Sequence, residues 1–356
     1  MLSFVVTFLG ALLTLFAMRP IAYKIGLVDK PNYRKRHQGA IPLIGGISLC
    51  IGNLCYYLIE WDNTRLPWLY LFSIFVLLLI GILDDRFDLS PFLRAGIQAI
   101  LAILMIDLGN VYLDHLGQIL GPFQLTLGTI GIIITVFATI AIINAFNMID
   151  GIDGLLGGLS SVSFAAISIL MYRDGQMDLA YWSFALIIAI IPYLMLNLGI
   201  PLGSKYKVFM GDAGSTVIGF TIIWILLLST QGKGHPMNPV TALWIIAIPL
   251  IDMVTIIYRR VRKGKSPFRP DRLHVHHLMV RAGLTSRQAF LLITFIAALC
   301  AGFGILGEIY YINEWIMFIL FICLFFVYAY SITRAWKITR WIRRLKRRAA
   351  RSIKVE

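Results

Sequence analysis

The sequence has few charged residues, and acidic ones are the scarcer kind. Charged side chains make up 14% of the 356 residues, and 32 Lys and Arg outnumber 18 Asp and Glu. A soluble domain of ordinary composition carries about 25% charged residues. The low charge, 59% hydrophobic residues and a mean hydropathy of +0.81 argue against a soluble protein and indicate one that crosses a membrane many times.

Cysteine is also scarce, and its positions carry no sign of a metal site. All four cysteines fall inside apolar segments, and neither CxxC nor a Cys/His spacing occurs; they are Cys50, Cys55, Cys300 and Cys323. This pattern is typical of small buried hydrophobic side chains. No soluble domain, low-complexity tract or convincing repeat is visible. The first apolar run lacks the basic start of a cleaved signal peptide.

Long apolar runs are abundant instead. A transmembrane helix needs about 20 mostly apolar residues, and eleven segments approach that length. They cover residues 2–22, 45–60, 66–83, 93–110, 127–146, 157–172, 178–198, 213–230, 239–258, 288–307 and 313–333. We therefore expect an all-α polytopic membrane protein with about eleven transmembrane helices. Residues 1–333 should form one catalytic domain and residues 334–356 a basic cytoplasmic tail.

The basic residues predict the orientation of the chain, because Lys and Arg near span ends face the cytoplasm. With eleven spans, most of them fall in the odd-numbered connections or in the tail. The exceptions are Arg19, Arg65, Arg173 and Lys233. The N-terminus is therefore expected on the outer, periplasmic side and the C-terminus in the cytoplasm.

Four clusters of polar residues also fall on odd-numbered connections. They are residues 84–88, 144–154, 207–215 and 274–277. A transporter would show polar groups near the membrane midplane and on both sides. A non-catalytic assembly factor would not need four such clusters. A site on one face favours an enzyme that joins a cytosolic substrate to a lipid-borne partner, with active-site loops in the cytoplasm.

The most informative cluster is the run from Asn144 to Gly154. Asn144, Asn147, Asp150 and Asp153 recur at three-residue spacing, which on a helix forms a slanting polar stripe. Carboxylates at a membrane edge are costly unless they have a function. Helix capping is the alternative, but two caps do not require four such residues. We interpret the run as part of a site for a metal ion and phosphates.

Three more acidic residues extend this interpretation. Asp84 and Asp85 are adjacent like charges, so a divalent cation or Arg86 should lie nearby unless they merely form a solvated turn. Asp212 lies in a glycine-flanked turn before the eighth span and is either a metal ligand or a simple N-cap. Asn197, at the end of the preceding span, is a second candidate ligand. Oxygen donors of this kind suit Mg²⁺ or Mn²⁺.

The histidines His274, His276 and His277 lie in a strongly basic connection that includes Arg272. Without HExxH or a partnering Cys, zinc is disfavoured, and the positive surroundings favour an anion such as a nucleotide phosphate. Lys207 is placed to meet a pyrophosphate. Contact with anionic lipids explains many of the basic residues, but it does not explain three clustered histidines.

Two features stand apart from these clusters. The basic tail interleaves Trp336 and Trp341 with Lys and Arg, which is typical of an amphipathic segment on the membrane surface. Membrane lipids, and not nucleic acid, are its expected partners. Asp252 lies inside the ninth span, where an acidic side chain is either functional or structurally paired.

Together the four clusters resemble the polyprenyl-phosphate N-acetylhexosamine-1-phosphate transferase superfamily, the glycosyltransferase 4 family. The resemblance covers nearly the whole chain and is closest to the WecA branch of undecaprenyl-phosphate α-N-acetylglucosaminyl 1-phosphate transferases. The MraY branch has three consecutive histidines where this chain has His-Val-His-His at 274–277, which argues against a muramyl-pentapeptide substrate. The CDP-alcohol phosphotransferases are disfavoured because Asp153-Gly154 is not followed by Ala-Arg.

The resemblance implies a reaction at the bacterial inner membrane. UDP-GlcNAc donates GlcNAc-1-phosphate to undecaprenyl phosphate, with Mg²⁺ or Mn²⁺, giving undecaprenyl-pyrophosphoryl-GlcNAc and UMP. The product would prime O-antigen lipopolysaccharide and enterobacterial common antigen, and tunicamycin is an expected inhibitor. Direct attack by the lipid phosphate and an aspartyl phospho-enzyme both remain open. So does the oligomeric state, including a homodimer.

With that reaction, each cluster acquires an expected role. The catalytic group is Asp84, Asp85, Asp150 and Asp153. Asp212 and Asn197 are the expected metal ligands. Substrate binding is expected from Asn144, Asn147, Lys207, Arg272, His274, His276 and His277.

Overall fold

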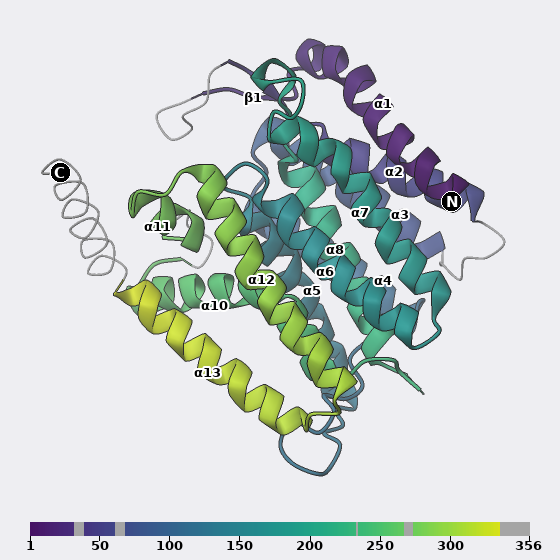
Figure 1. Cartoon of the computed structure of the whole chain (residues 1–356), viewed down its shortest axis with the longest axis vertical. Coiled ribbons are helices and arrows are strands. Elements are labelled where there is room, and N and C mark those ends of the chain that lie inside the picture. The colour runs from purple at the N-terminus through teal and green to yellow at the C-terminus, as the bar shows by residue number, and fades with distance from the viewer. Residues whose placement is uncertain (32–38, 61–67, 233, 267–272, 335–356) are drawn as a thin grey trace, which may run out of the picture.

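The computed structural model describes residues 1–31, 39–60, 68–232, 234–266 and 273–334, and this part of the chain is almost entirely helical (Figure 1). The expected all-α class is confirmed. The only sheet within these ranges pairs β1 (Val28–Asp29) with β2 (Ile41–Pro42), and η2 (Ser204–Tyr206) is a short 3₁₀ helix. The helices are α1 (Leu2–Ile25), α2 (Gly45–Ile59), α3 (Trp68–Phe87), α4 (Pro91–Asp107), α5 (Thr129–Ile149), α6 (Leu155–Arg173), α7 (Met177–Asn197), α8 (Gly211–Thr230), α9 (Pro239–Ile245), α10 (Ala247–Arg262), α11 (Val275–Arg281), α12 (Ser286–Ile309) and α13 (Glu314–Thr333).

Not every expected span is a full-length helix. Eight helices of the described ranges are long and apolar enough to cross a membrane, or nine if α9 and α10, which meet at a bend of 81°, form one span. The segments expected at 45–60 and 93–110 form helices of only 15 and 17 residues. α2 begins at Gly45, the first residue of the expected segment, and the N–H groups of Gly45 and Gly46 donate to the carbonyls of Phe209 and Met210, at the entrance to α8.

The most central helix is α8, whose residues are nearly all buried. It packs against α3 and α5 along most of its length. A Cβ at Gly219 would lie 2.6 Å from the Cα of Ile143, so the glycine lets α5 approach the backbone of α8. Gly81 allows the same approach of α3 to Ala213. This close packing brings the C-terminal ends of α3 and α5 beside the first turn of α8.

At the other end of the molecule, side chains near the helix ends form hydrogen bonds with the segments that connect the helices. The side chain of Gln231, after α8, accepts hydrogen bonds from the backbone of Asp114 and His115 at 2.9 and 3.2 Å. Glu308, near the end of α12, accepts from the Asn238 backbone N–H at 2.7 Å and from the Thr241 hydroxyl at 2.5 Å. α13 lies at the edge of the molecule (Figure 1), against α9 and α10.

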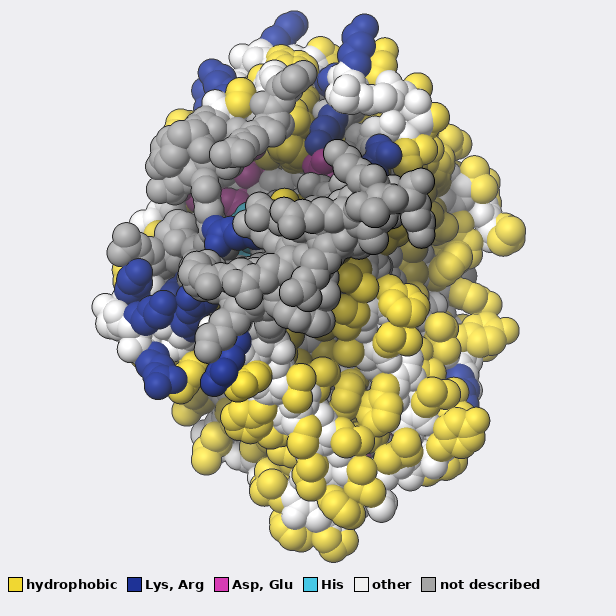
Figure 2. All heavy atoms as spheres, turned by 60° about the vertical axis from the view of Figure 1, so that its left-hand side comes forward, with side chains coloured by type: hydrophobic (Ala, Val, Ile, Leu, Met, Phe, Trp, Pro, Cys, Tyr) yellow, Lys and Arg dark blue, Asp and Glu magenta, His cyan; other side chains and the backbone are white. Residues whose placement is uncertain are grey.

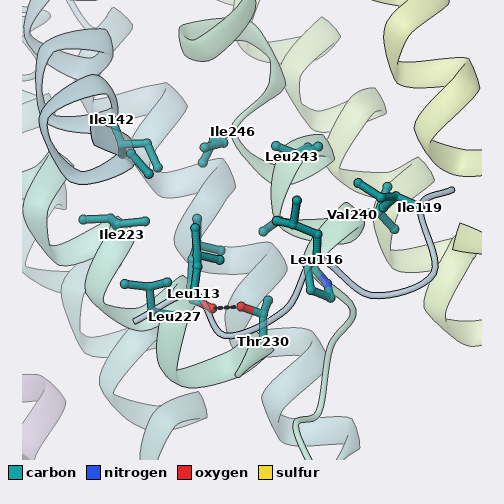
Figure 3. A pocket seen from close by; sticks show the side chains of 14 residues that line it. Leu113, Leu116, Ile119, Ile142, Ile223, Leu227, Thr230, Val240, Leu243 and Ile246 are labelled. Atoms are coloured by element: carbon teal, nitrogen blue, oxygen red, sulfur yellow. Dashed lines mark hydrogen bonds between the residues drawn. The ribbon is translucent and has the colours of Figure 1, made fainter. Parts of the chain in front are cut away.

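An apolar cavity of about 130 Å³ lies between α5, α8, α9 and the connection from α4 to α5 (Figure 3). Its walls include Ile142, Ile223, Leu243 and Ile246. The hydroxyl of Thr230 also lines it but donates to the Leu226 carbonyl at 2.8 Å within its own helix. The cavity therefore presents hydrocarbon and does not suit a nucleotide or a metal ion.

Candidate active site

Acidic and histidine side chains gather in a hollow at one end of the helix bundle. Figure 2 shows Asp, Glu and His side chains inside this hollow and Lys and Arg side chains around it, whereas the lower part of the same face is largely hydrophobic. The chain segments that meet there are the ends of α3, α5 and α7, the starts of α4 and α8, and α11. The four polar clusters of the sequence therefore come together.

Asp85 binds the beginning of α8. Its Oδ1 accepts a hydrogen bond from the backbone N–H of Asp212 at 2.8 Å, and its Oδ2 accepts from the N–H of Ala213 at 3.3 Å. A carboxylate here satisfies N–H groups that have no partner within the helix and meets the positive end of the helix dipole. Asp85 thus fixes the backbone that carries Asp212.

Arg94 of α4 lies between two carboxylates. It forms an ion pair with the buried Asp84, and its NH1 lies 3.6 Å from Oδ2 of Asp212. The other oxygen of Asp84 accepts from the Leu89 N–H at 2.9 Å. Sequence reasoning used Arg94 only to orient the chain. The available signal was an arginine at the start of an apolar segment, ten residues after an acidic one.

The two asparagines of α5 differ in their contacts. Nδ2 of Asn147 donates to Oδ1 of Asp212 at 2.5 Å and to the Ser215 hydroxyl at 2.9 Å, so it orients the Asp212 carboxylate. Asn144, nearly one turn earlier, donates instead to Oε1 of Gln98 at 3.0 Å. Asn144 therefore joins α5 to α4, and Asn147 is the one that contacts the Asp212 site.

The connection after α5 is tied to the connection before α8. Nζ of Lys207 lies 2.6 Å from Oδ2 of Asp153. Asn197 is buried, and its Oδ1 accepts from the Gly154 N–H at 2.6 Å while its Nδ2 donates to the Val208 carbonyl at 2.8 Å. Both polar atoms of Asn197 thus bond to backbone, and the side chain holds the two connections together.

Asp150 has the most perturbed environment of the acidic residues outside the spans. Solvent reaches its side chain, yet the surrounding protein removes most of its hydration. This desolvation, and then the negative charges of Asp212 and Asp153, raise the pKa of Asp150 to about 7. A bound cation would relieve the crowding of negative charge.

His276 packs directly on the connection after α5. A Cβ at Gly151 would lie 2.7 Å from Cε1 and 2.8 Å from Cδ2 of the His276 ring, so only glycine leaves room for it. Burial, and then the neighbouring His277 and His274, lower the pKa of His276, which keeps it neutral at pH 7. Among the described residues its Nδ1 has no hydrogen-bond partner.

His274 is held in place by Asp252 of α10. Its Nδ1 lies 2.6 Å from Oδ2 of Asp252, and Oδ1 of Asp252 accepts from the Val275 N–H at 3.1 Å and from the Tyr328 hydroxyl at 2.5 Å. The sequence left open whether Asp252 is functional or structurally paired, and these contacts show that it is paired. Arg272 and the basic tail from residue 335 lie outside the described residues.

The donors of this hollow fit a metal ion that is shared with substrate. In the described part of the chain, no group of three or more His, Cys, Asp or Glu side chains is arranged to hold a metal alone. Mg²⁺ is commonly held by one or two carboxylates together with substrate phosphates. Asp212, 39% exposed, and the crowded Asp150 supply such oxygen donors.

Comparison with known proteins agrees with this chemistry. A family model described as glycosyl transferase family 4 matches residues 67–230. A protein of Haemophilus influenzae named undecaprenyl-phosphate α-N-acetylglucosaminyl 1-phosphate transferase is 86% identical over 351 residues, which cover 99% of each chain. Proteins of the same name from Pasteurella multocida and Escherichia coli K12 are 82% and 60% identical, over 99% and 97% of this chain and 98% and 94% of their own.

Proposed function

This chain belongs to glycosyl transferase family 4, among the undecaprenyl-phosphate α-N-acetylglucosaminyl 1-phosphate transferases, and from that premise we propose how its residues perform the reaction. It transfers GlcNAc-1-phosphate from UDP-GlcNAc to undecaprenyl phosphate and releases UMP. The observation that carries the residue assignment is Asp212, held at the first turn of α8 by contacts from Asp85, Arg94 and Asn147.

The proposed orientation places this hollow in the cytoplasm, with eleven crossings, a periplasmic N-terminus and a cytoplasmic C-terminus in the bacterial inner membrane. Contacts at the helix ends support alternating crossings if α2, α4 and the bent pair α9–α10 each count as one. Arg19 of α1 donates to a carbonyl before α8, and Arg287 of α12 donates to the Leu198 carbonyl after α7. At the opposite end, Glu308 of α12 meets the start of α9.

Asp212, with help from Asp150, is the proposed carboxylate ligand of Mg²⁺ or Mn²⁺. When bound, the metal would neutralise charge on the pyrophosphate of the donor. Asn147 and Asp85 keep the Asp212 side chain and backbone in place before substrate arrives. The single side-chain oxygen of Asn197 and both carboxylate oxygens of Asp85 already accept backbone N–H groups, so we assign these two residues to positioning.

The donor phosphates are proposed to bind between Lys207 and the histidines. Asp153 holds the Lys207 ammonium at 2.6 Å, so this charge is fixed in the hollow instead of sampling solvent. His274 and His276 approach from α11. A neutral, buried His276 presents a nitrogen donor or acceptor without adding a second fixed charge. Fixed groups of this kind stabilise a phosphoryl transfer by position and charge.

The lipid phosphate is the proposed nucleophile. One of its oxygens forms a bond to the β-phosphorus of UDP-GlcNAc, while the bond from that phosphorus to the bridging oxygen breaks and UMP leaves. Arg94, which already pairs with Asp84 and lies beside Asp212, is placed to attract the incoming phosphate. Asp84 and Asp85 are fully occupied by Arg94 and backbone N–H groups, which favours direct attack over an aspartyl nucleophile.

One assay tests this function. Purified protein is incubated with UDP-[¹⁴C]GlcNAc, undecaprenyl phosphate and Mg²⁺, and lipid-linked label and UMP are measured with and without the metal. We expect equal amounts of both products, only with the metal, and inhibition by tunicamycin. Release of free GlcNAc-1-phosphate without lipid-linked label would contradict the transfer. In the cell, the product is proposed to prime O-antigen and enterobacterial common antigen synthesis.

A further inference from the structure

Asp252 is a buried carboxylate that three donors from different parts of the chain share. It is 1% exposed, on α10. Its Oδ2 faces Nδ1 of His274, and its Oδ1 faces both the Val275 N–H and the hydroxyl of Tyr328 on α13. A buried charge is tolerated when it is hydrogen-bonded throughout. No part of the transfer as described above uses Asp252 or Tyr328.

The contact fixes which nitrogen of His274 can meet a ligand. A carboxylate only accepts hydrogen bonds, so the ring places a proton on Nδ1 and leaves Nε2 as the nitrogen for substrate. The same carboxylate holds the Val275 N–H and therefore the backbone that leads to His276. Tyr328 in turn limits the rotation of the carboxylate. One side chain thus sets both the orientation of a ring and the path of the segment that carries the histidines.

We propose that Asp252 is a positioning residue for donor binding, that it acts through His274, and that Tyr328 fixes it for this task. The inference rests on the proposed function, in which His274 binds the donor phosphates. A carboxylate that merely anchored α11 to α10 would affect stability and both substrates alike. A positioning role affects UDP-GlcNAc selectively and disappears when His274 is absent.

Asp252→Asn is a sharp perturbation because all three partners of the carboxylate donate. An amide has one oxygen, so its NH₂ must face either His274 or the pair Val275 and Tyr328. Facing His274, it requires Nδ1 to accept and moves the ring proton to Nε2. Partners that orient a metal-ligating histidine typically contribute about 10- to 100-fold to metal affinity or activity, and we take the same range for a histidine that binds phosphate. We expect a loss of this size in kcat/KM for UDP-GlcNAc, with KM for undecaprenyl phosphate unchanged.

The decisive experiment is a double-mutant cycle in the full-length purified enzyme, with Asp252→Asn, His274→Ala and both together. If Asp252 acts through His274, the double variant has the kcat/KM of His274→Ala alone, within about twofold to threefold, because coupled residues are not additive. Thr255→Val is the matched control. It lies on the same helix, is 1% exposed, and its hydroxyl has no partner in the described ranges, so it should keep wild-type kinetics.

Each outcome has one consequence. Losses that multiply in the double variant, or equal effects on both substrates, would overturn the positioning role of Asp252. A His274→Ala enzyme with wild-type kcat/KM for UDP-GlcNAc would overturn the proposed donor contact itself. If Asp252→Asn does not fold, Tyr328→Phe replaces it in the cycle, because it keeps the Asp252–His274 pair. A loss in Tyr328→Phe that persists unchanged without His274 would contradict the inference.

Discussion

Replacing Gly151 by Ala tests whether the run after α5 and the histidines form one site. The added methyl group would lie 2.7 and 2.8 Å from two carbons of the His276 ring, whereas carbon atoms in contact prefer about 3.5–4.0 Å. Nε2 of the ring would lie closer still, so the buried ring must retreat by more than about 1 Å. Overpacking of this kind costs about 1–3 kcal/mol, which corresponds to about a 5- to 150-fold loss if it falls on the transition state.

The assay is steady-state transfer from UDP-GlcNAc, combined with a thermal unfolding measurement. We expect kcat/KM for UDP-GlcNAc to fall within that range, because His276 leaves its place beside the donor. Gly302→Ala on α12 is the matched control, since nothing lies within 4 Å of its added methyl group, and it should be neutral or slightly stabilising. A Gly151→Ala enzyme with wild-type kcat/KM and melting temperature would refute the packing of His276 on this glycine.

Three further predictions follow from the same hollow. Asp85→Asn should destabilise the enzyme by about 1–3 kcal/mol, because the amide turns an NH₂ toward an N–H donor of α8; an unchanged melting temperature would contradict the capping role. Arg94→Gln should lower kcat about 10- to 100-fold, since it removes charged hydrogen bonds worth about 1.5–3 kcal/mol, and added Mg²⁺ should not restore it. Raising the pH from 6 to 8 ionises Asp150, whose raised pKa of about 7 favours the protonated form. The metal-free enzyme should therefore lose stability across this interval, Mg²⁺ should raise the melting temperature more at pH 8, and Asp150→Asn should weaken both trends.

Hydrophobic patterning predicted the helical class and the place of the apolar helices, because apolar length is a local property of the chain. It placed α2 correctly to within one residue, but it could not predict that the ninth segment would bend by 81°. The bonds from the start of α2 to the Phe209 and Met210 carbonyls join distant parts of the chain, and apolar length could not predict them either. Apolar composition alone does not distinguish a complete crossing from a short or broken helix.

The sequence predicted which residues gather in the candidate site better than it predicted what each of them contacts. Charge asymmetry along the sequence predicted that Asp85, Asn147, Asp212 and the histidines belong to one face. Whether a carboxylate faces a metal or a helix end depends on which N–H groups surround it. Asp85 meets the backbone of α8, and Asn197 meets two connections. Arg94 was missed because a single arginine in an apolar segment has the same local pattern as a topology signal.

The central claim is that Asp212 holds the metal with the donor at the start of α8. Its most direct test is UMP release by Asp212→Asn across a Mg²⁺ titration, with Asp178→Asn, in the first turn of α7, as a control. The account predicts a loss of about 10²–10³-fold, typical of removing one charge-stabilising group, and a wild-type Mg²⁺ dependence for the control. An Asp212→Asn enzyme with wild-type turnover and wild-type Mg²⁺ dependence would contradict it.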